Sequence, residues 1–484
     1  MKLNNPELLR SQCLINGEWC DALSGKREAV INPATGVELA SIPLVSEEET
    51  QQAIAAAQRA QNEWKQLTAK QRSALLLAWV DKVLAAQEDL AQLMTAEQGK
   101  SLAEARGEVA YAASFITWFA EEAKRVDGAV LQAPQASQRL VVVKQPIGVC
   151  AAITPWNFPA AMITRKVAPA LAAGCAIIVK PAEQTPLTAL ALAKLAQDAG
   201  IPAGVLQVVT GEAAQVGKVL CDSPVVRKLS FTGSTEVGRI LMAQCAPSIK
   251  KLSLELGGNA PVIVFDDANL DAAVAGIMAS KFRNSGQTCV CANRIYVQDG
   301  IYERLAEKLV AAVEQLKVGD GSQEGTTQGP LIDSDAVAKV QSHIDDALIK
   351  GAQIATGGQP HALGGTFFQP TVVTGVTQKM RFAKEETFGP VAPLFRFHDE
   401  AEAIAMANDT EFGLAAYLFT QNAARQWRVP EALEYGMVGI NTGLISNEVA
   451  PFGGVKQSGL GREGSRYGIE EYLELKYLCI DVSC

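Results

Sequence analysis

The 484-residue sequence has few histidines, no long apolar run and no cysteine pair with C-x-x-C spacing. Its three histidines, His343, His361 and His398, lie far from any cysteine cluster, so a zinc site is poorly supported and we expect no bound metal. The longest uncharged apolar run, residues 167–179, is too short to cross a membrane. The N-terminal segment also lacks an apolar core of signal-peptide length. We therefore expect a cytoplasmic protein without membrane contact.

Runs of positive charge are absent as well. The formal net charge is −9 and the basic residues are scattered, which argues against nucleic acid as a partner. Ten cysteines are spread over the whole chain instead of forming the dense framework of small secreted proteins, so we expect free thiols.

Core material, by contrast, is ample. Hydrophobic residues make up 48% and charged residues 20% of the chain, as in ordinary globular enzymes. The length exceeds what one hydrophobic core supports, so two or three compact units are expected.

The order of apolar patterns predicts an α/β protein. Residues 46–126 have helical spacing and open on a Ser-x-x-Glu capping signature at Ser46 and Glu49. From about residue 139, short apolar runs alternate with amphipathic segments, which predicts parallel βαβ units up to about residue 255 and a second α/β unit up to about residue 450. Strand-like alternation over 466–482 and 139–144 predicts a strand arm outside both units, and exposed strands tend to pair with a partner chain.

The stretch GQTCVC, residues 286–291, contains the most interesting thiols. An isolated cysteine is more often a small buried hydrophobe than a nucleophile. Cys289, however, follows a probable helix end and a Gly-Gln-Thr turn, which predicts an exposed thiol whose pKa a helix end or Arg283 lowers. The histidines have no motif context, so a carboxylate is the better candidate base. Glu255, between an apolar strand and two glycines, fits a buried base with a raised pKa, although an outward-facing strand residue is the alternative.

Several loops after predicted strands carry polar side chains. Asn157 in TPWNFP is a candidate oxyanion donor, although an ordinary turn residue is the commoner reading. Lys180 and Glu183 in KPAEQTP are placed to contact a ribose. FTGSTEVG, residues 231–238, begins a helix and suits a pyrophosphate, but it departs from the G-x-G-x-x-G fingerprint. For the loops EETFGP and PFGGVKQSGLGRE a plain turn remains the simpler reading.

Together these motifs resemble the aldehyde dehydrogenase superfamily over essentially the whole chain. TPWNFP, KPAEQTP, FTGSTEVG, LELGGNAP, GQTCVCANR, EETFGP and PFGGVKQSG occur in the order typical of that family. AMITRK, SFTGSTEVGR, FRNSGQTCVCANR and SGLGREGSRYGIEEYLELKY are most similar to the succinate-semialdehyde dehydrogenases, especially the bacterial enzymes of 4-aminobutyrate breakdown.

The resemblance implies a three-part architecture and a homodimer or homotetramer. A Rossmann-type cofactor domain would comprise residues 1–128 and 149–255, and an α/β catalytic domain residues 256–458. A small β oligomerisation arm would comprise residues 129–148 and 459–484.

The resemblance also implies the catalytic roles. Cys289 would attack the aldehyde, and the Asn157 amide and the Cys289 N–H would hold the oxyanion of the thiohemiacetal. Hydride transfer would leave a thioester, and Glu255 would activate the water that hydrolyses it. A full set of cofactor residues is implied as well: Trp156, Asn157, Lys180, Pro181, Ala182, Glu183, Gly233, Ser234, Leu256, Glu386 and Phe388.

Cofactor and substrate preferences follow from charge. Glu183 favours NAD because a carboxylate repels a 2′-phosphate, although Lys180 keeps NADP possible. A semialdehyde with a distal carboxylate suits Arg165 and Arg283, which match substrate-pocket arginines of the subfamily, with Ser446 adding a hydroxyl. The alternative for both arginines is a structural ion pair.

Other functions stay open at this point. Glutarate semialdehyde is one methylene longer and is not excluded. A broader aldehyde dehydrogenase, a thiol-dependent esterase and a non-catalytic binding relative are the further alternatives. A disulfide between Cys289 and Cys291 under oxidation is a hypothesis that rests on their spacing alone.

Overall fold

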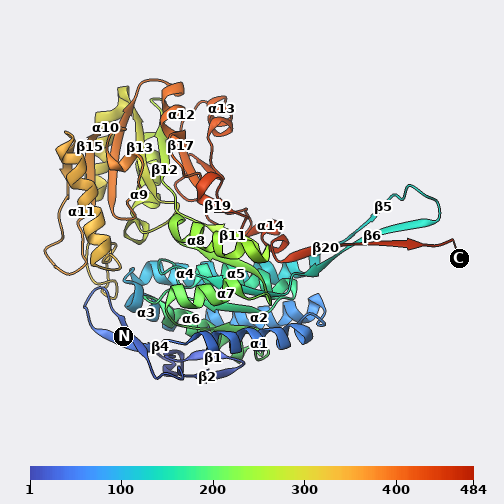
Figure 1. The fold of residues 1–484 in the computed structure, drawn as a ribbon. Helices are drawn as coiled ribbons and strands as arrows, with labels where there is room; N and C mark the ends of the chain where they lie inside the picture. The colour runs from blue at the N-terminus through green and yellow to red at the C-terminus, as the bar shows by residue number, and fades with distance from the viewer. Residues whose placement is uncertain (484) are drawn as a thin grey trace.

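The computed structural model describes residues 1–483, which form two α/β units and a projecting β arm (Figure 1). The first unit is built on an eight-stranded sheet in the order β19-β11-β10-β7-β8-β9-β1-β2. Its strands are β1 (Cys13–Ile15), β2 (Glu18–Cys20), β7 (Val149–Ile153), β8 (Ile177–Lys180), β9 (Leu206–Val208), β10 (Val226–Thr232), β11 (Lys251–Glu255) and β19 (Gly459–Leu460). The five central strands, β7 to β11, are parallel, and the outer ones pair antiparallel.

Helices surround this sheet, which explains why its central strands are continuous apolar runs. They are α1 (Glu47–Trp64), α2 (Ala69–Ala85), α3 (Gln87–Gln98), α4 (Leu102–Glu122), α5 (Ala161–Ala173), α6 (Pro186–Asp198), α7 (Ala213–Asp222) and α8 (Thr235–Cys245). The expected capping box closes the start of α1, where the Ser46 side chain accepts from the Glu49 N–H and the Glu49 carboxylate accepts from the Ser46 N–H. A separate two-stranded hairpin, β3 (Arg27–Ile31) and β4 (Glu38–Pro43), lies near the N-terminus.

The strand order fixes where a ligand is expected in this unit. From β7 the chain moves to β8 and β9 on one side, and β10 and β11 lie on the other side of β7. Ligands of such sheets bind at the carboxyl ends of the strands, where the winding reverses. The loops after β7 and β10 therefore flank the expected cleft.

The second unit has a seven-stranded sheet in the order β14-β15-β16-β13-β12-β17-β18. Its strands are β12 (Ala260–Val264), β13 (Ala292–Gln298), β14 (Gln353–Thr356), β15 (Thr371–Val376), β16 (Val391–Phe397), β17 (Ala415–Phe419) and β18 (Met437–Ile440). Its helices are α9 (Leu270–Lys281), α10 (Tyr302–Val313), α11 (Ser334–Ile349), α12 (Glu400–Asn408) and α13 (Arg425–Ala432). The expected α/β class is thereby confirmed.

The arm consists of β5 (Ala129–Leu131), β6 (Gln138–Pro146) and β20 (Leu473–Asp481). As expected, the two distant strand segments pair, with Leu473 opposite Pro146 and Asp481 opposite Gln138. The arm extends away from both units (Figure 1).

Two details at the C-terminus differ from expectation. The strand predicted over 466–482 begins only at Leu473, because the preceding residues form the helix α14 (Ser465–Glu470), which buries Gly468 and Ile469 against α4 and α5. In addition, β19 pairs with β11 and so belongs to the first sheet, although residues 459 and 460 were expected in the arm. Among residues 1–483, no helix is both long and apolar enough to span a membrane.

Candidate active site

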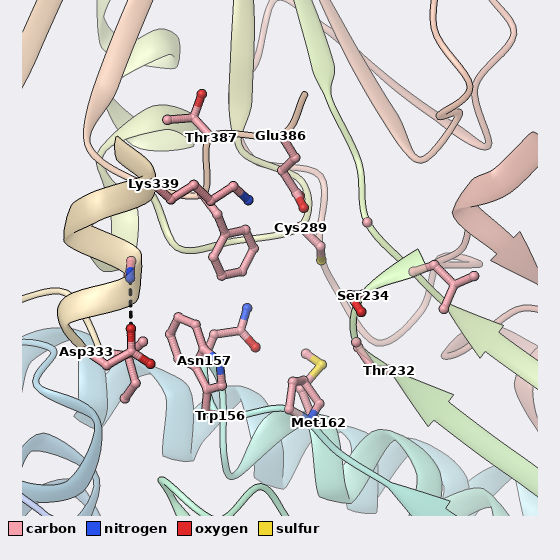
Figure 2. A pocket seen from close by; sticks show the side chains of 17 residues that line it. Trp156, Asn157, Met162, Thr232, Ser234, Cys289, Asp333, Lys339, Glu386 and Thr387 are labelled. Atoms are coloured by element: carbon pink, nitrogen blue, oxygen red, sulfur yellow. Dashed lines mark hydrogen bonds between the residues drawn. The ribbon is translucent and has the colours of Figure 1, made fainter. Parts of the chain in front are cut away.

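A cavity of about 280 Å³ lies where the two units meet (Figure 2). The first unit lines it with residues that directly follow β7, β10 and β11, at the edge expected from the strand order. The second unit contributes Cys289, the segment 386–388 before β16 and the first turns of α11. Most of the predicted site residues on the cofactor side are therefore brought together: Trp156, Asn157, Gly233, Ser234, Leu256, Cys289, Glu386 and Phe388.

The loop that carries Cys289 is tightly packed. Asn284 and Ser285 adopt left-handed backbone conformations, with φ of 51° and 54°, which is uncommon for residues other than glycine. Gly258 is required nearby, because a Cβ at this position would lie 2.5 Å from the carbonyl oxygen of Cys289. One of the two glycines after Glu255 thus permits the close approach of the nucleophile loop.

The environment of Cys289 does not lower its pKa, contrary to the sequence-based expectation. Burial raises the pKa of the thiol well above its ordinary value, and the negative charge of Glu255 raises it further. Arg165, and not Arg283, is the cation that opposes this shift. This environment therefore favours the neutral thiol.

The Glu255 carboxyl lies beside this thiol. It ends β11, and its Oε1 lies 4.0 Å from the sulfur of Cys289. Burial raises the pKa of the Glu255 carboxyl to about 7, while Arg165 opposes the shift and Glu463 adds to it. A carboxylate with a pKa near neutrality suits a general base, as its sequence context indicated.

Arg165 on α5 joins Glu255 to a second buried carboxylate. Its Nη2 lies 2.8 Å from Glu463 Oε2 and 3.9 Å from Glu255 Oε2. Lys166 also pairs with Glu463 and donates to the Thr232 hydroxyl. The structural ion pair considered for Arg165 is thus present, but its Nε and Nη2 make no hydrogen bond of good geometry within residues 1–483.

Asn157 is held by a buried network. Its Nδ2 donates to the Gln287 carbonyl at 3.0 Å, which leaves one amide hydrogen for the cavity that Asn157 lines. Its own backbone carbonyl accepts from Lys100 Nζ at 2.8 Å and from Asn284 Nδ2 at 3.0 Å. Lys100 is in turn paired with Glu108, whose carboxylate accepts from the first N–H groups of α5.

The part of the cavity where the sequence predicts the cofactor combines aromatic rings, a carboxylate and a helix N-terminus. The rings of Trp156 and Phe388 meet edge to face with centroids 5.6 Å apart. Glu386 accepts from the Gly258 N–H at 3.2 Å, and burial raises the pKa of its carboxyl to about 7. Ser234 caps α8 at the cavity wall, where its side chain accepts from the Val237 N–H.

Glu183 lies at a second cavity beside the first, and Lys180 is its ion-pair partner. Lys180 ends β8, and its ammonium pairs with the Glu183 carboxylate across the buried Pro181 and Ala182. Glu183 lines this second cavity of about 470 Å³, which shares residues 332 and 333 with the first.

The predicted substrate residues are positioned less uniformly. The Arg283 guanidinium lies 4.8 Å from the centroid of the Phe158 ring and makes no ion pair within residues 1–483. Ser446 lies in the loop after β18, and this loop contacts α4 through a hydrogen bond from Ser114 Oγ to Glu448 Oε2 at 3.2 Å. No contact of the Ser446 hydroxyl itself places it beside Cys289.

Several lining residues were not predicted. They are Met162, Thr232, Ile332, Asp333, Ala336, Lys339 and Thr387. Asp333 caps α11, and its side chain accepts from the Ala336 N–H (Figure 2). This cap is readable in the sequence, but its position at the cleft is not.

Comparison with known proteins identifies the family. The family model described as "Aldehyde dehydrogenase family" matches residues 19–478. This chain belongs to the aldehyde dehydrogenase family. The enzyme is 65% identical over 480 residues to the succinate-semialdehyde dehydrogenase (NADP(+)) of Escherichia coli K12, covering 99% of this chain and 100% of that protein. It is 64% identical to a glutarate-semialdehyde dehydrogenase of Pseudomonas putida, with full coverage of both chains. The solved structure of a succinate-semialdehyde dehydrogenase from Burkholderia pseudomallei, 64% identical, superimposes with a TM-score of 0.99 over both entire chains.

Cys291 is a free thiol in this aldehyde dehydrogenase, as is Cys289. The Cys291 side chain is buried and its sulfur donates to the Lys281 carbonyl at 3.4 Å. A disulfide between the two thiols therefore requires the segment to leave the described conformation.

Proposed function

We propose that the protein oxidises succinate semialdehyde to succinate with reduction of NAD or NADP, as a step of 4-aminobutyrate breakdown. The observation that carries this proposal is the pairing of Cys289 with Glu255, 4.0 Å apart, beside the guanidinium of Arg165. The aldehydes named for the E. coli and P. putida relatives, succinate and glutarate semialdehyde, both carry a carboxylate at the distal end. Arg165 and Arg283 supply the positive charge that such a group needs.

The chemistry follows from the roles of these residues. The Cys289 sulfur attacks the aldehyde carbon as a thiolate, after its proton has passed to solvent, and Asn157 Nδ2 with the Cys289 N–H stabilises the oxyanion. A bound nicotinamide dinucleotide supplies the hydride acceptor. Glu255 then takes a proton from the water that hydrolyses the Cys289 thioester, and succinate is released.

The residues around the cavity fit such a cofactor. Trp156 and Phe388 offer aromatic surface, Glu386 offers a carboxylate for a ribose hydroxyl, and the N-terminus of α8 with Ser234 suits a pyrophosphate. We assign Gly233 and Leu256 to the same cleft, and Lys180, Pro181, Ala182 and Glu183 to the second ribose.

We further propose that NAD is the preferred cofactor. The Glu183 carboxylate repels a 2′-phosphate, and the ammonium of Lys180 that would attract this phosphate is already paired with Glu183. The E. coli relative is named for NADP(+), so the proposed preference for NAD would distinguish this protein from that relative.

Steady-state kcat/KM for succinate semialdehyde with saturating NAD and with saturating NADP tests the proposal. Glutarate semialdehyde, butanal as the neutral control and Cys289→Ala as the background complete the set. We expect a clear preference for succinate semialdehyde that disappears in Cys289→Ala. Faster turnover of glutarate semialdehyde would reassign the substrate, and equal turnover of butanal would leave a broader aldehyde dehydrogenase.

The remaining alternatives are separated by the same assay. Hydrolysis of an activated ester without cofactor that exceeds aldehyde oxidation would favour a thiol esterase, and the absence of any turnover would favour a non-catalytic binding protein. We also propose that the arm pairs with a second copy of this chain in a homodimer or homotetramer. The apolar side chains of Val130, Leu475 and Tyr477 are exposed on it.

A further inference from the structure

The helix α4 carries a tyrosine near Arg165, one of the two arginines that we propose bind the distal carboxylate of the substrate. Tyr111 and Phe115 lie one turn apart, and their rings meet edge to face with centroids 5.0 Å apart. The centroid of the Phe115 ring is in turn 5.7 Å from the guanidinium carbon of Arg165, which also lies 3.9 Å from the centroid of the Phe452 ring. Tyr111 is thus placed beside Arg165 by a short chain of packed aromatic groups.

The Tyr111 hydroxyl has no hydrogen-bond partner among residues 1–483, although it is buried. Other buried tyrosines in this chain do have partners. The Tyr302 hydroxyl donates to the Leu394 carbonyl at 3.0 Å, and the Tyr417 hydroxyl donates to the Val290 carbonyl at 2.8 Å. Buried polar groups are almost always paired, so the unpaired Tyr111 hydroxyl is a donor available to a group that a ligand brings.

The charged groups around this hydroxyl favour a negatively charged ligand. Burial raises the pKa of the Tyr111 phenol, Arg165 and Arg283 oppose the shift, and negative charges on Glu463 and Cys289 add to it. The phenol is therefore a neutral donor that lies near two cations and near the nucleophile. Arg165 Nε, also buried and without a hydrogen bond within residues 1–483, is a further unused donor in the same place.

A carboxylate matches this set of donors. Its two oxygens offer about four acceptor positions, enough for a guanidinium and a hydroxyl together. The loop that contains Ser446 is tied to the same stretch of α4, because the single hydroxyl hydrogen of Ser114 lies within reach of both the Tyr111 carbonyl, at 2.8 Å, and the Glu448 carboxylate, at 3.2 Å.

We propose that Tyr111 is a substrate-binding residue whose hydroxyl donates a hydrogen bond to the distal carboxylate of the semialdehyde, alongside Arg165 and Arg283. This assignment rests on the proposed function and adds to it a neutral donor that none of the sequence motifs contains. Because the hydroxyl contacts the carboxylate and not the reacting carbon, its loss acts on the binding of acid-bearing aldehydes and leaves neutral ones unaffected.

The variant Tyr111→Phe tests this directly, since it removes one oxygen and keeps the ring against Phe115. A hydrogen bond to a charged group corresponds to a loss of roughly ten- to a hundredfold in kcat/KM for succinate semialdehyde, expressed mainly as a higher KM. The kcat/KM for butanal is expected to stay within about twofold. Tyr302→Phe is the matched control, because it removes a buried hydroxyl far from the pocket and leaves the ratio of the two substrates unchanged.

A binding measurement provides a second readout that does not depend on turnover. Calorimetric titration with succinate is expected to show weaker binding to Tyr111→Phe than to the wild type, and equal binding to Tyr302→Phe. Unchanged selectivity together with unchanged succinate binding in Tyr111→Phe would overturn the assignment while the proposed function stands. A wild-type enzyme that does not prefer the acid-bearing aldehyde would overturn the proposed function, and the role of Tyr111 with it.

Discussion

Nη2 of Arg165 lies 2.8 Å from Oε2 of Glu463, and through this buried contact Glu463 acts on the protonation of Glu255. Burial is the main cause that raises the pKa of the Glu255 carboxyl; Arg165 lowers this pKa, and the negative charge of Glu463 raises it further. Glu463 lies between β19 and α14, so this control comes from the segment that leads into the arm.

Replacing Glu463 should therefore shift the pH profile of thioester hydrolysis to lower pH. The pKa of Glu255 is raised to about 7, so its basic form is present above that pH and is lost as the pH falls below it. Glu463→Gln removes a negative charge and leaves Arg165 free to act on Glu255, and both effects lower the pKa of Glu255. We expect the acid limb of the rate of thioester hydrolysis to move to lower pH.

Hydrolysis of p-nitrophenyl acetate without cofactor, followed between pH 5 and 9, measures this limb. Glu474→Gln, an exposed carboxylate on β20, is the control and should keep the wild-type profile. An acid limb that stays in place in Glu463→Gln, or moves upward, would contradict the coupling.

The variant Glu255→Gln separates the formation of the thioester, which reduces the cofactor, from the hydrolysis of the thioester. In Glu255→Gln we expect steady-state turnover to fall by about a hundredfold or more, because a general base is lost from thioester hydrolysis. Because the Cys289 thiol loses its proton to solvent in the proposed mechanism, one equivalent of reduced cofactor should still form in a rapid burst, visible by stopped-flow fluorescence. Cys289→Ala should show neither burst nor turnover. Loss of the burst in Glu255→Gln would mean that Glu255 also takes the proton of Cys289.

The loops that line the cavity were predicted in part because the motifs at 154–159 and 231–238 follow strands whose carboxyl ends meet at one edge, whereas Glu386 and Phe388 were predicted only from the family resemblance. The glycines after Glu255 and the cap at Ser234 are local features, and local features are visible in a single sequence. The segment 466–472 shows that a local apolar pattern does not always predict the secondary structure. Its alternating apolar residues suit a strand, yet Ile469 is buried against other helices and the segment is helical up to Glu470.

Features that depend on the packing of distant segments were either not predicted or predicted wrongly. Lys339 and Asp333 lie on an ordinary amphipathic helix, and only the packing of the two units brings α11 to the cleft. The pairing of Lys100 with Glu108, which fixes the Asn157 carbonyl, has no recognisable motif. The sequence predicted a lowered pKa for Cys289, and this prediction was wrong. Burial and the carboxylate of Glu255, which belongs to another strand, raise the pKa, and neither can be read from the Cys289 loop alone.

The cofactor preference is expected to depend on Glu183. In Glu183→Ser the carboxylate that repels the 2′-phosphate is gone and the Lys180 ammonium is released from its ion pair. We expect kcat/KM for NADP to rise by about tenfold or more, since a unit charge a few ångströms away has an effect of this order even with strong screening. Gln184→Ser, the exposed neighbour, should keep the wild-type ratio of NAD to NADP. A wild-type ratio in Glu183→Ser would show that another group selects the cofactor.

The arm is expected to control assembly. Leu475 is 69% exposed on β20, on a surface that also exposes Tyr477. A charge placed there disfavours burial against a second copy, because an unpaired carboxylate is costly to remove from water. Sedimentation velocity of Leu475→Asp should therefore show a smaller species than the wild type at the same concentration. Leu363→Asp, at an exposed loop position of the second unit, is the matched control and should sediment as the wild type does. If Leu475→Asp retains the wild-type assembly, the subunits associate through a surface other than this side of the arm.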